Sequence, residues 1–242
     1  MWQPGRLKII TNLFRYPLDL ILPRSCVLCG APLQLAANRN ICCRCAEDML
    51  FIGAIVCRKC GLPSPSVGGK TAPVPTSQCG WCRKRRYIFD QARAIGLYEG
   101  NLKELIHLYK YNHMVHLAGD ILGLVVRHFP DDFRESAFDY LIPVPLHKTK
   151  LREREYNQTA ILAEKISAFL NVPVNSNILI RDRYTQPQVA LSGVERWRNV
   201  RNAFRLKEKI SLEDKNLLLL DDVFTTGATI NECARVLRKT NP

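Results

Sequence analysis

The sequence predicts an α/β protein in which a small N-terminal double zinc ribbon precedes a domain with a parallel sheet flanked by helices. Four Cys-x2-Cys pairs lie within residues 26–82. After residue 90, apolar stretches of strand length alternate with amphipathic stretches of helix length, a pattern typical of a parallel sheet covered on both faces. Finally, four consecutive leucines, Leu217–Leu220, run into two aspartates and a threonine-rich turn.

Composition is that of a globular protein, with 47% hydrophobic and 24% charged residues in a chain of 242. No stretch approaches the roughly 20 apolar residues that a membrane span needs. The apolar N-terminus is interrupted by Arg15, Pro17 and Asp19 and lacks a small-residue cleavage site, so we predict no signal peptide and a cytoplasmic protein. The expected division is a helical segment at 1–22, a double zinc ribbon at 23–88 and a second domain at 89–242.

Positive charge is concentrated in the first third of the chain. The formal net charge is +13; residues 1–90 carry a surplus of nine positive charges and residues 91–242 a surplus of four. Two zinc ions bound by eight thiolates would lower the net charge to about +9. Such a surplus favours polyanionic partners such as nucleic acid, although basic proteins without such partners are common.

The cysteine spacing predicts metal sites. Two residues between paired cysteines let both thiolates face one cation, and Gly30 and Gly61 follow the first and third pairs, where a left-handed turn is needed. The alternative is a disulfide-rich secreted module; the missing export signal, the leftover Cys43 and the cytoplasmic character of the second domain count against it. The predicted ligands are Cys26, Cys29, Cys42, Cys45, Cys57, Cys60, Cys79 and Cys82.

Sequential pairing joins the first two pairs at one zinc and the last two at the other. Cross-braced pairing, first with third, remains the alternative, but it closes longer loops at a greater entropic cost. Cys43 could replace Cys42, although Cys42 preserves the two-residue spacing. Since protein would fill all four positions at each site, both zinc ions are expected to be structural.

A basic run, Arg83, Lys84, Arg85 and Arg86, follows the last cysteine pair, and Trp81 lies inside that pair. Basic side chains beside an aromatic ring can hold phosphates and stack a base, so this run is a candidate nucleic-acid contact. The alternative is a solvated linker, with Trp81 covering the small zinc core. We place the linker to the second domain near residues 83–90, and a Pro/Gly/Ser-rich loop at 61–78.

The second domain is expected to alternate strands and helices. Asn101 and Glu104 have capping-box spacing at the start of the first helix. The predicted elements are a strand at 92–98, helices from 101 to about 111 and at 116–129, a strand at 140–144, a helix at 157–170 and a strand at 216–220.

The segment Leu217–Thr229 predicts a ligand site. Asp221 and Asp222 emerge at the carboxyl end of a buried strand, where open α/β sheets bind ligands. Thr225–Thr229 then opens a helix to about Lys239, whose N-terminus suits a phosphate monoester. The turn would bind the phosphate and the two carboxylates would accept hydrogen bonds from a diol, and a ribose 5-phosphate carries both groups. The alternative is a strand–turn–helix unit without a ligand, in which the two acids simply face solvent.

This segment resembles the phosphoribosyl-diphosphate motif of type I phosphoribosyltransferases, and with the zinc module the chain resembles the ComF family of competence-associated proteins. Further similar segments are Tyr98–Gly100 with Lys110–Tyr111, Pro143–Leu146 with Arg154–Gln158, and Gln188 to Phe204. Glu155 departs from the family's glycine, and the chain stops at Asn241-Pro242, where the family adds a last strand. The final strand is therefore expected to be missing, because either the fold is shortened or the chain is incomplete.

The resemblance implies a type I phosphoribosyltransferase-like domain that binds phosphoribosyl diphosphate, with Mg²⁺ arriving on the diphosphate. It implies a pyrophosphate loop at 143–150, with donors among His147, Lys148, Lys150 and Arg152, and a mobile hood at 185–204 with Gln188, Arg196 and Asn199. Asp221 and Asp222 would be catalytic if transfer occurs. The implied ligand-binding residues are Asp221, Asp222, Val223, Phe224, Thr225, Thr226, Gly227, Ala228, Thr229, Lys148 and Arg152.

Three functions are compatible with these features. One is a factor that assists uptake or recombination of single-stranded DNA, with phosphoribosyl diphosphate as a regulatory or structural ligand. Another is a phosphoribosyltransferase with an unidentified acceptor, and a third is an adaptor whose zinc module docks a helicase or recombination protein. An amidophosphoribosyltransferase is disfavoured, because residue 2 is Trp rather than the N-terminal cysteine of a glutaminase.

Overall fold

The computed structural model describes residues 24–33, 39–53, 55–63, 79–186, 192–207 and 211–240. The predicted N-terminal helical segment, 1–22, lies outside these ranges. Two short helices, α3 (Cys43–Glu47) and α4 (Gly80–Lys84), belong to the cysteine-rich part. The remaining elements are α5 (Gly100–Tyr111), η1 (Val115–Leu117), α6 (Ala118–Arg127), α7 (Asp131–Arg134), β1 (Tyr140–Pro143), α8 (Lys148–Arg154), α9 (Gln158–Leu170), β2 (Leu179–Arg181), α10 (Gly193–Val200), β3 (Phe204–Leu206), β4 (Leu217–Leu220), α11 (Ala228–Leu237) and η3 (Arg238–Thr240).

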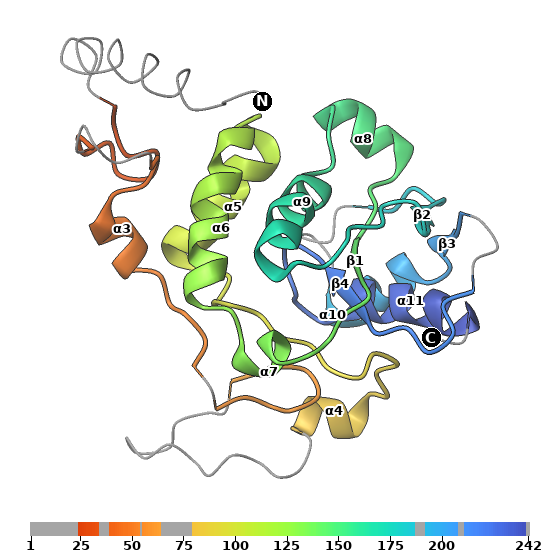
Figure 1. Ribbon diagram of the computed structural model, residues 1–242. Helices are drawn as coiled ribbons and strands as arrows, with labels where there is room; N and C mark the ends of the chain where they lie inside the picture. The colour runs from red at the N-terminus through yellow and green to blue at the C-terminus, as the bar shows by residue number, and fades with distance from the viewer. Residues whose placement is uncertain are drawn as a thin grey trace, which may run out of the picture.

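The centre of the protein is a parallel pair of strands. β1 and β4 pair in parallel, from Tyr140 opposite Leu217 to Pro143 opposite Leu220. An isolated parallel bridge between Leu141 and Val174 adds a further position on the other side of β1. β2 and β3 form a separate antiparallel pair (Figure 1).

Helices cover both faces of this sheet, as the sequence predicted. Successive strand residues point to opposite faces. Leu141 and Leu218 belong to a core formed with α5, α6 and α9, whereas Ile142 belongs to a second core formed with α10 and α11. The sheet is therefore buried on both sides.

The two zinc-ribbon segments occupy different places. Helix α3 lies beside α5 and α6, and α4 lies at the opposite end of the cysteine-rich part, near α7 (Figure 1). Cys26, Ile41, Cys45 and Met49 are part of the core that contains α5 and α6. The first ribbon thus shares a hydrophobic core with the second domain.

Two sequence expectations were wrong at the start of the second domain. Residues 92–98 form no strand; an isolated antiparallel bridge joins Gly96 to Phe51. Glu99 is the N-cap of α5 and makes no side-chain capping bond. The Asn101 side chain instead donates to the Cys45 carbonyl at 3.1 Å, so a contact with the first ribbon replaces the expected capping box.

Candidate functional site

The first cysteine quartet is a compact sulfur cluster. The knuckle at Cys26–Cys29 closes with Gly30, at φ 73°, whose N–H donates to the Cys26 carbonyl at 2.8 Å. Cys42 is the N-cap of α3 and Cys45 lies within it. All four sulfur atoms lie within 4.8 Å of one another, and the Cys29 and Cys42 sulfurs are 3.7 Å apart.

The second quartet repeats this construction. Gly61, at φ 69°, donates to the Cys57 carbonyl at 2.9 Å, and Cys79 is the N-cap of α4. The Sγ–Sγ distances are 3.9 Å for Cys57–Cys82 and 3.6 Å for Cys60–Cys79. The cysteines are therefore grouped sequentially, with Cys42 rather than the exposed Cys43 in the first quartet.

Both quartets fit zinc. Four thiolates at Zn–S distances of about 2.3 Å in a tetrahedron are about 3.8 Å apart, close to the separations observed here. Burial raises the pKa of Cys45, and the neighbouring Cys29 and Cys42 thiols raise it further. At Cys26 burial is outweighed by backbone N–H donors from Cys42 and Leu28, so its pKa falls to about 6. One thiol thus ionises readily, and a cation is needed to hold several thiolates together.

The two predicted carboxylates lie at the carboxyl end of β4. Asp221 accepts a hydrogen bond from the Asp222 backbone N–H at 2.9 Å, and Asp222 forms an ion pair of 2.8 Å with Lys110. Burial, and then the adjacent Asp222, raise the pKa of Asp221 above its ordinary range, while Lys110 opposes the shift. A pair of acids with one ammonium group attracts hydroxyl donors or a further cation.

Lys110 was not predicted as a site residue. It lies in the last turn of α5, and its carbonyl accepts a hydrogen bond of 3.0 Å from the side chain of Gln158, which is 1% exposed. The Tyr109 hydroxyl donates to the Gln158 carbonyl at 2.8 Å. The segment at Arg154–Gln158 therefore holds α9 against α5 and positions Lys110; the similarity at Lys110–Tyr111 was the one sequence signal for it.

The loop after β4 continues directly into α11. Gly227 is the N-cap, at φ 73°, and a Cβ there would lie 2.9 Å from the Phe224 ring and 3.0 Å from the Tyr87 ring. Glycine is therefore required at this position on both backbone and steric grounds. The Tyr87 hydroxyl donates to the Thr226 carbonyl at 3.1 Å, which fixes the loop against the segment that follows the second ribbon.

The other residues of the loop divide between surface and interior. Thr225 is exposed, whereas Ala228 is buried in the first turn of α11. Val223 packs on the core with α5 and α6, and Phe224 on the core with α10 and α11. The first N–H groups of a helix lack intrahelical acceptors, so this turn has donors available for an anion.

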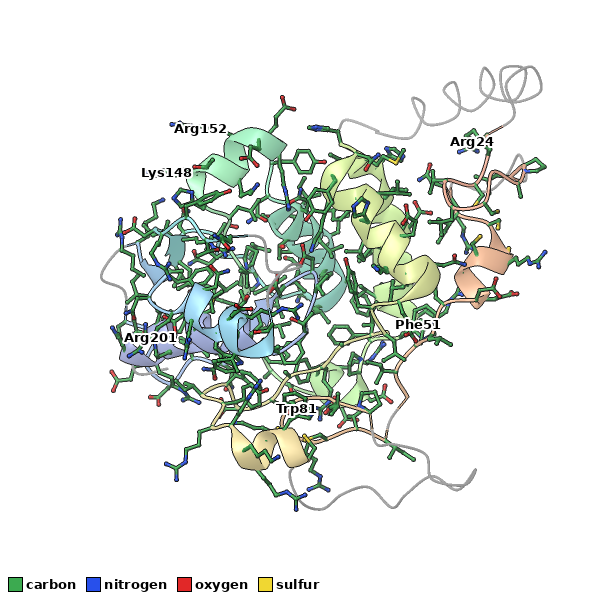
Figure 2. The ribbon with its side chains drawn as sticks, turned by 180° about the vertical axis from the view of Figure 1, so that it is seen from behind. Arg24, Phe51, Trp81, Lys148, Arg152 and Arg201 are labelled. Carbon is green, nitrogen blue, oxygen red and sulfur yellow. The ribbon has the colours of Figure 1, made fainter. Side chains whose placement is uncertain are left out.

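The predicted pyrophosphate loop contains a helix. His147 caps α8 by accepting the Thr149 N–H at 3.2 Å. Lys148 and Arg152 are exposed on α8 (Figure 2), and Lys150 is paired with Glu153 at 2.5 Å. An isolated parallel bridge joins His147 to Arg181. Glu155, at φ 66°, adopts the left-handed conformation that the family's glycine would provide.

Arg181 is a second basic residue that the sequence did not reveal. Its guanidinium lies over the Phe204 ring at 5.2 Å and donates to the Thr185 hydroxyl, and its Nε is buried with no partner among the described residues. Burial lowers the pKa of Arg181 and the Asp221 carboxylate raises it. Arg181 therefore adds positive charge near Asp221; nothing in its local sequence distinguishes it.

The predicted hood corresponds in part to α10. Ser192 and Glu195 form a capping box at its start. The Asn199 side chain donates to the Gln186 carbonyl at 2.9 Å, and Arg196 is half-buried on α10. Gln188 lies outside the described residues. Asn199 thus links α10 to Gln186, in the segment that follows β2.

The basic run after the second ribbon faces two directions. Arg83, Lys84 and Arg86 are exposed. Arg85 turns inward, with its guanidinium 4.8 Å from the Trp81 ring centre and 5.7 Å from that of Trp197. Three of the four predicted nucleic-acid residues are therefore on the surface, and the fourth packs between two tryptophans.

A cavity of about 430 Å³ adjoins the two carboxylates. Its walls come from the second ribbon, from α5 and α6 and from the loop after β4. Aromatic and apolar side chains dominate the lining, which includes Leu62, Trp81, Tyr87, Tyr98, Phe224, Asp221 and Asp222. This volume is within the usual range for small-molecule pockets.

A family described as "Double zinc ribbon domain" matches residues 17–83. "Competence protein F" of Haemophilus influenzae is 30% identical over 218 residues, covering 88% of this chain and 90% of that protein. "DNA utilization protein YhgH" of Escherichia coli K12 is 29% identical, covering 90% and 92%. "Competence protein ComFC" of Bacillus subtilis is 25% identical, covering 88% of both. In the described part of the chain, no helix has the length and apolar character needed to cross a membrane.

Proposed function

The chain belongs to the ComF family of competence proteins, and from this premise we propose that it binds phosphoribosyl diphosphate and single-stranded DNA and assists DNA uptake or recombination. The observation that carries the ligand assignment is the β4–α11 connection: paired carboxylates, a hydroxyl-rich loop and a glycine N-cap follow one another at the end of a buried strand.

Each part of that connection fits one part of the ligand. The turn at Thr225–Thr229 donates to the 5-phosphate, while Asp221 and Asp222 accept hydrogen bonds from the ribose hydroxyls. Lys148 and Arg152, exposed on α8 after β1, would supply positive charge to the diphosphate. Mg²⁺ arriving with the diphosphate would neutralise its charge, and because Lys110 already pairs with Asp222, this carboxylate would leave the cation mainly to ligand oxygens and water.

The nucleic-acid assignment rests on charge. Residues 1–90 carry most of the surplus positive charge, and Arg83, Lys84 and Arg86 are exposed beside the half-exposed Trp81 ring. Exposed cations next to an aromatic side chain suit a single strand, because phosphates and bases are contacted together. The relatives named for competence and DNA utilization support the same assignment.

Ligand binding is tested by titrating the zinc-loaded protein with phosphoribosyl diphosphate and Mg²⁺, with and without single-stranded DNA. We expect Asp221→Asn/Asp222→Asn to weaken binding by about 100-fold or more, because each neutral amide accepts a weaker hydrogen bond than a carboxylate and turns an N–H2 donor toward the ribose hydroxyls. The matched control is Glu213→Gln/Asp214→Asn, an exposed acidic pair at the other end of β4. Equal affinities in both double variants would refute the assignment.

DNA binding is tested by its salt dependence. The triple variant Arg83→Ala/Lys84→Ala/Arg86→Ala should reduce the slope of log affinity against log salt by about 2, since each phosphate contact to a single strand contributes about 0.7. A charge-matched control is Lys103→Ala/Arg127→Ala/Lys165→Ala, which neutralises three exposed cations elsewhere. Identical slopes in the two variants would rule out the basic run as the contact.

The cavity favours a second candidate function, transfer of the ribose phosphate to an acceptor. A nucleophilic atom of the acceptor would form a bond to the anomeric carbon while the bond to the diphosphate oxygen breaks, with the acceptor proton passing to solvent. The aromatic lining beside Asp221 suits a planar acceptor. Catalysis would be established if nucleobases, amines or nucleic acids cause pyrophosphate release that Asp221→Asn/Asp222→Asn abolishes. If none of these acceptors causes release, binding alone is favoured.

A further inference from the structure

Arg85 lies where three parts of the chain meet. It is the C-cap residue of α4, in the second ribbon, and its N–H donates to the Trp81 carbonyl. Its guanidinium packs on the rings of both Trp81, at 4.8 Å, and Trp197 on α10, at 5.7 Å. A Cβ at Gly193 on α10 would lie 3.9 Å both from an Arg85 nitrogen and from the Thr226 methyl group. The second ribbon, α10 and the ligand loop therefore converge here.

Buried polar atoms without partners gather at this junction. Among the described residues, four buried side-chain atoms lack a hydrogen-bond partner, and three of them are Arg85 Nη1, Trp197 Nε1 and Thr226 Oγ1. The described residues also provide no acidic ion-pair partner for Arg85. Leaving such groups unpaired is costly, so their concentration at one place indicates a group that pairs with them when bound.

The chemistry of these atoms selects an anion. A guanidinium and an indole N–H are donors without acceptor capacity, and a threonine hydroxyl can also donate. The loop that carries Thr226 leads to the N-cap of α11, a ten-residue helix whose first turn also favours negative charge. A phosphate monoester meets these donors with three oxygens, and an arginine fork pairs with two of them.

We propose that Arg85 and Trp197 complete the phosphate-monoester site of the β4–α11 loop, so that the second zinc ribbon is a working part of the ligand site. This inference rests on the proposed function and extends it to residues outside the phosphoribosyl-diphosphate motif. Tyr87 supports the same junction, because its ring packs on Gly227 and its hydroxyl donates to Thr226.

The test is a calorimetric titration of the full-length, zinc-loaded protein with phosphoribosyl diphosphate and Mg²⁺. We expect Arg85→Ala to weaken binding by about 10- to 100-fold and Trp197→Phe, which keeps a ring but removes the N–H, by about 3- to 10-fold. Arg85→Lys should fall between wild type and Arg85→Ala, since it keeps the charge without the fork. The control Arg58→Ala, an exposed residue of the same ribbon, should bind within twofold of wild type.

Competition with two fragments locates the contact. Ribose 5-phosphate carries the monoester without the diphosphate. Arg85→Ala should therefore weaken the ability of ribose 5-phosphate to displace phosphoribosyl diphosphate, while pyrophosphate should displace it as well as from wild type. Equal weakening of both, or of pyrophosphate alone, would overturn the assignment.

Zinc content and thermal unfolding identify variants that fold poorly. If Arg85→Ala loses zinc, the proposal is tested with Arg85→Lys and Trp197→Phe instead. Wild-type affinity for phosphoribosyl diphosphate in both variants would overturn the inference. If Arg85→Ala binds normally while Asp221→Asn/Asp222→Asn does not, this inference fails and the proposed function stands. If wild type binds no phosphoribosyl diphosphate, both fail.

Discussion

The first zinc ribbon packs against helices α5 and α6, whereas the second adjoins the candidate ligand loop. Their local construction is the same: a knuckle closed by a left-handed glycine, then a cysteine pair at the start of a short helix. In the first ribbon, Cys26 and Cys45 are part of a large core. In the second, the cysteines form a small cluster of their own, packed against Tyr87.

The difference shows that neighbouring contacts, rather than the metal motif, decide what each ribbon contributes. The first ribbon is bonded to α6 through Asn40, whose backbone N–H and side chain both donate to Asp120, at 2.9 and 2.7 Å. The second ribbon is connected to the ligand loop through Tyr87, which packs against its cysteines and donates to the Thr226 carbonyl. We therefore expect damage to the first ribbon to lower stability and damage to the second to lower ligand affinity.

The largest effects should come from removing one zinc ligand at each site. Cys45→Ser should lower the free energy of unfolding by about 3 kcal/mol or more, because the first ribbon lies in the main core. Cys82→Ser should lower it by about half as much but weaken binding of phosphoribosyl diphosphate at least about tenfold. Urea denaturation, calorimetry and metal analysis, with zinc falling from about two to one per chain, provide the measurements. Equal losses of stability and of affinity in both variants would contradict the distinction.

A glycine pair gives a sharper comparison. Gly30→Ala should cost about 1 kcal/mol, because alanine at φ 73° is strained but a Cβ there meets nothing within 4 Å among the described residues. Gly61→Ala should cost about 3 kcal/mol, since a Cβ would also lie 2.5 Å from the Ala92 carbonyl oxygen and force the backbone to move. Thermal unfolding monitored by calorimetry would measure both costs, and similar values would show that the second ribbon is loosely attached.

The stability of the folded protein should also depend on pH through Asp221, which lines the cavity beside the second ribbon. Burial and Asp222 raise the pKa of Asp221 in the folded protein, so stability present at about pH 4 and below is lost as pH rises toward the raised folded pKa. Asp221→Asn removes this loss; its stability should match wild type near pH 4 and exceed it by about 1–2 kcal/mol near pH 8. Melting temperatures across that range measure the difference. Asp214→Asn, at an exposed position, serves as the control, and a constant difference at every pH would argue against a buried Asp221 carboxyl.

The smallest effects concern single hydrogen bonds. Asn40→Ala and Tyr87→Phe should each cost about 1 kcal/mol of stability. Tyr87→Phe should also weaken ligand affinity a few-fold, because the Thr226 carbonyl loses its donor, whereas Asn40→Ala should leave affinity unchanged. Paired denaturation and titration experiments would reveal any reversal of this pattern.

The parts of the fold that depend on neighbouring residues were predictable from the sequence. Cysteine spacing predicted both quartets, because each ligand pair is local and a tetrahedral site needs two pairs. The run Leu217–Leu220, followed by acids and a glycine turn, predicted β4 and α11. In both cases the pattern is carried by short stretches of chain, four residues for each cysteine pair and thirteen for Leu217–Thr229.

Features that depend on distant contacts were missed. The segment 92–98 has the composition of a strand, but within it only Gly96 forms a β-bridge, and its partner is Phe51. Lys110 becomes a site residue because Gln158, 48 residues away, fixes its backbone. In sequence Arg85 looks like the rest of its basic run, and its packing against Trp197 on the distant α10 is what sets it apart. Such pairings are set by tertiary packing and leave no local pattern.

The bond between Tyr87 and Thr226 joins residues 139 positions apart, and this separation has a consequence during synthesis. All eight zinc ligands leave the ribosome within the first 82 residues, so both metal sites can close before β1 exists. At about 5–20 residues per second, the loop that Tyr87 and Arg85 contact emerges roughly 7–30 s later. During that interval the aromatic and basic face of the second ribbon is exposed, and a chaperone or a nucleic acid can occupy it before the rest of the chain arrives.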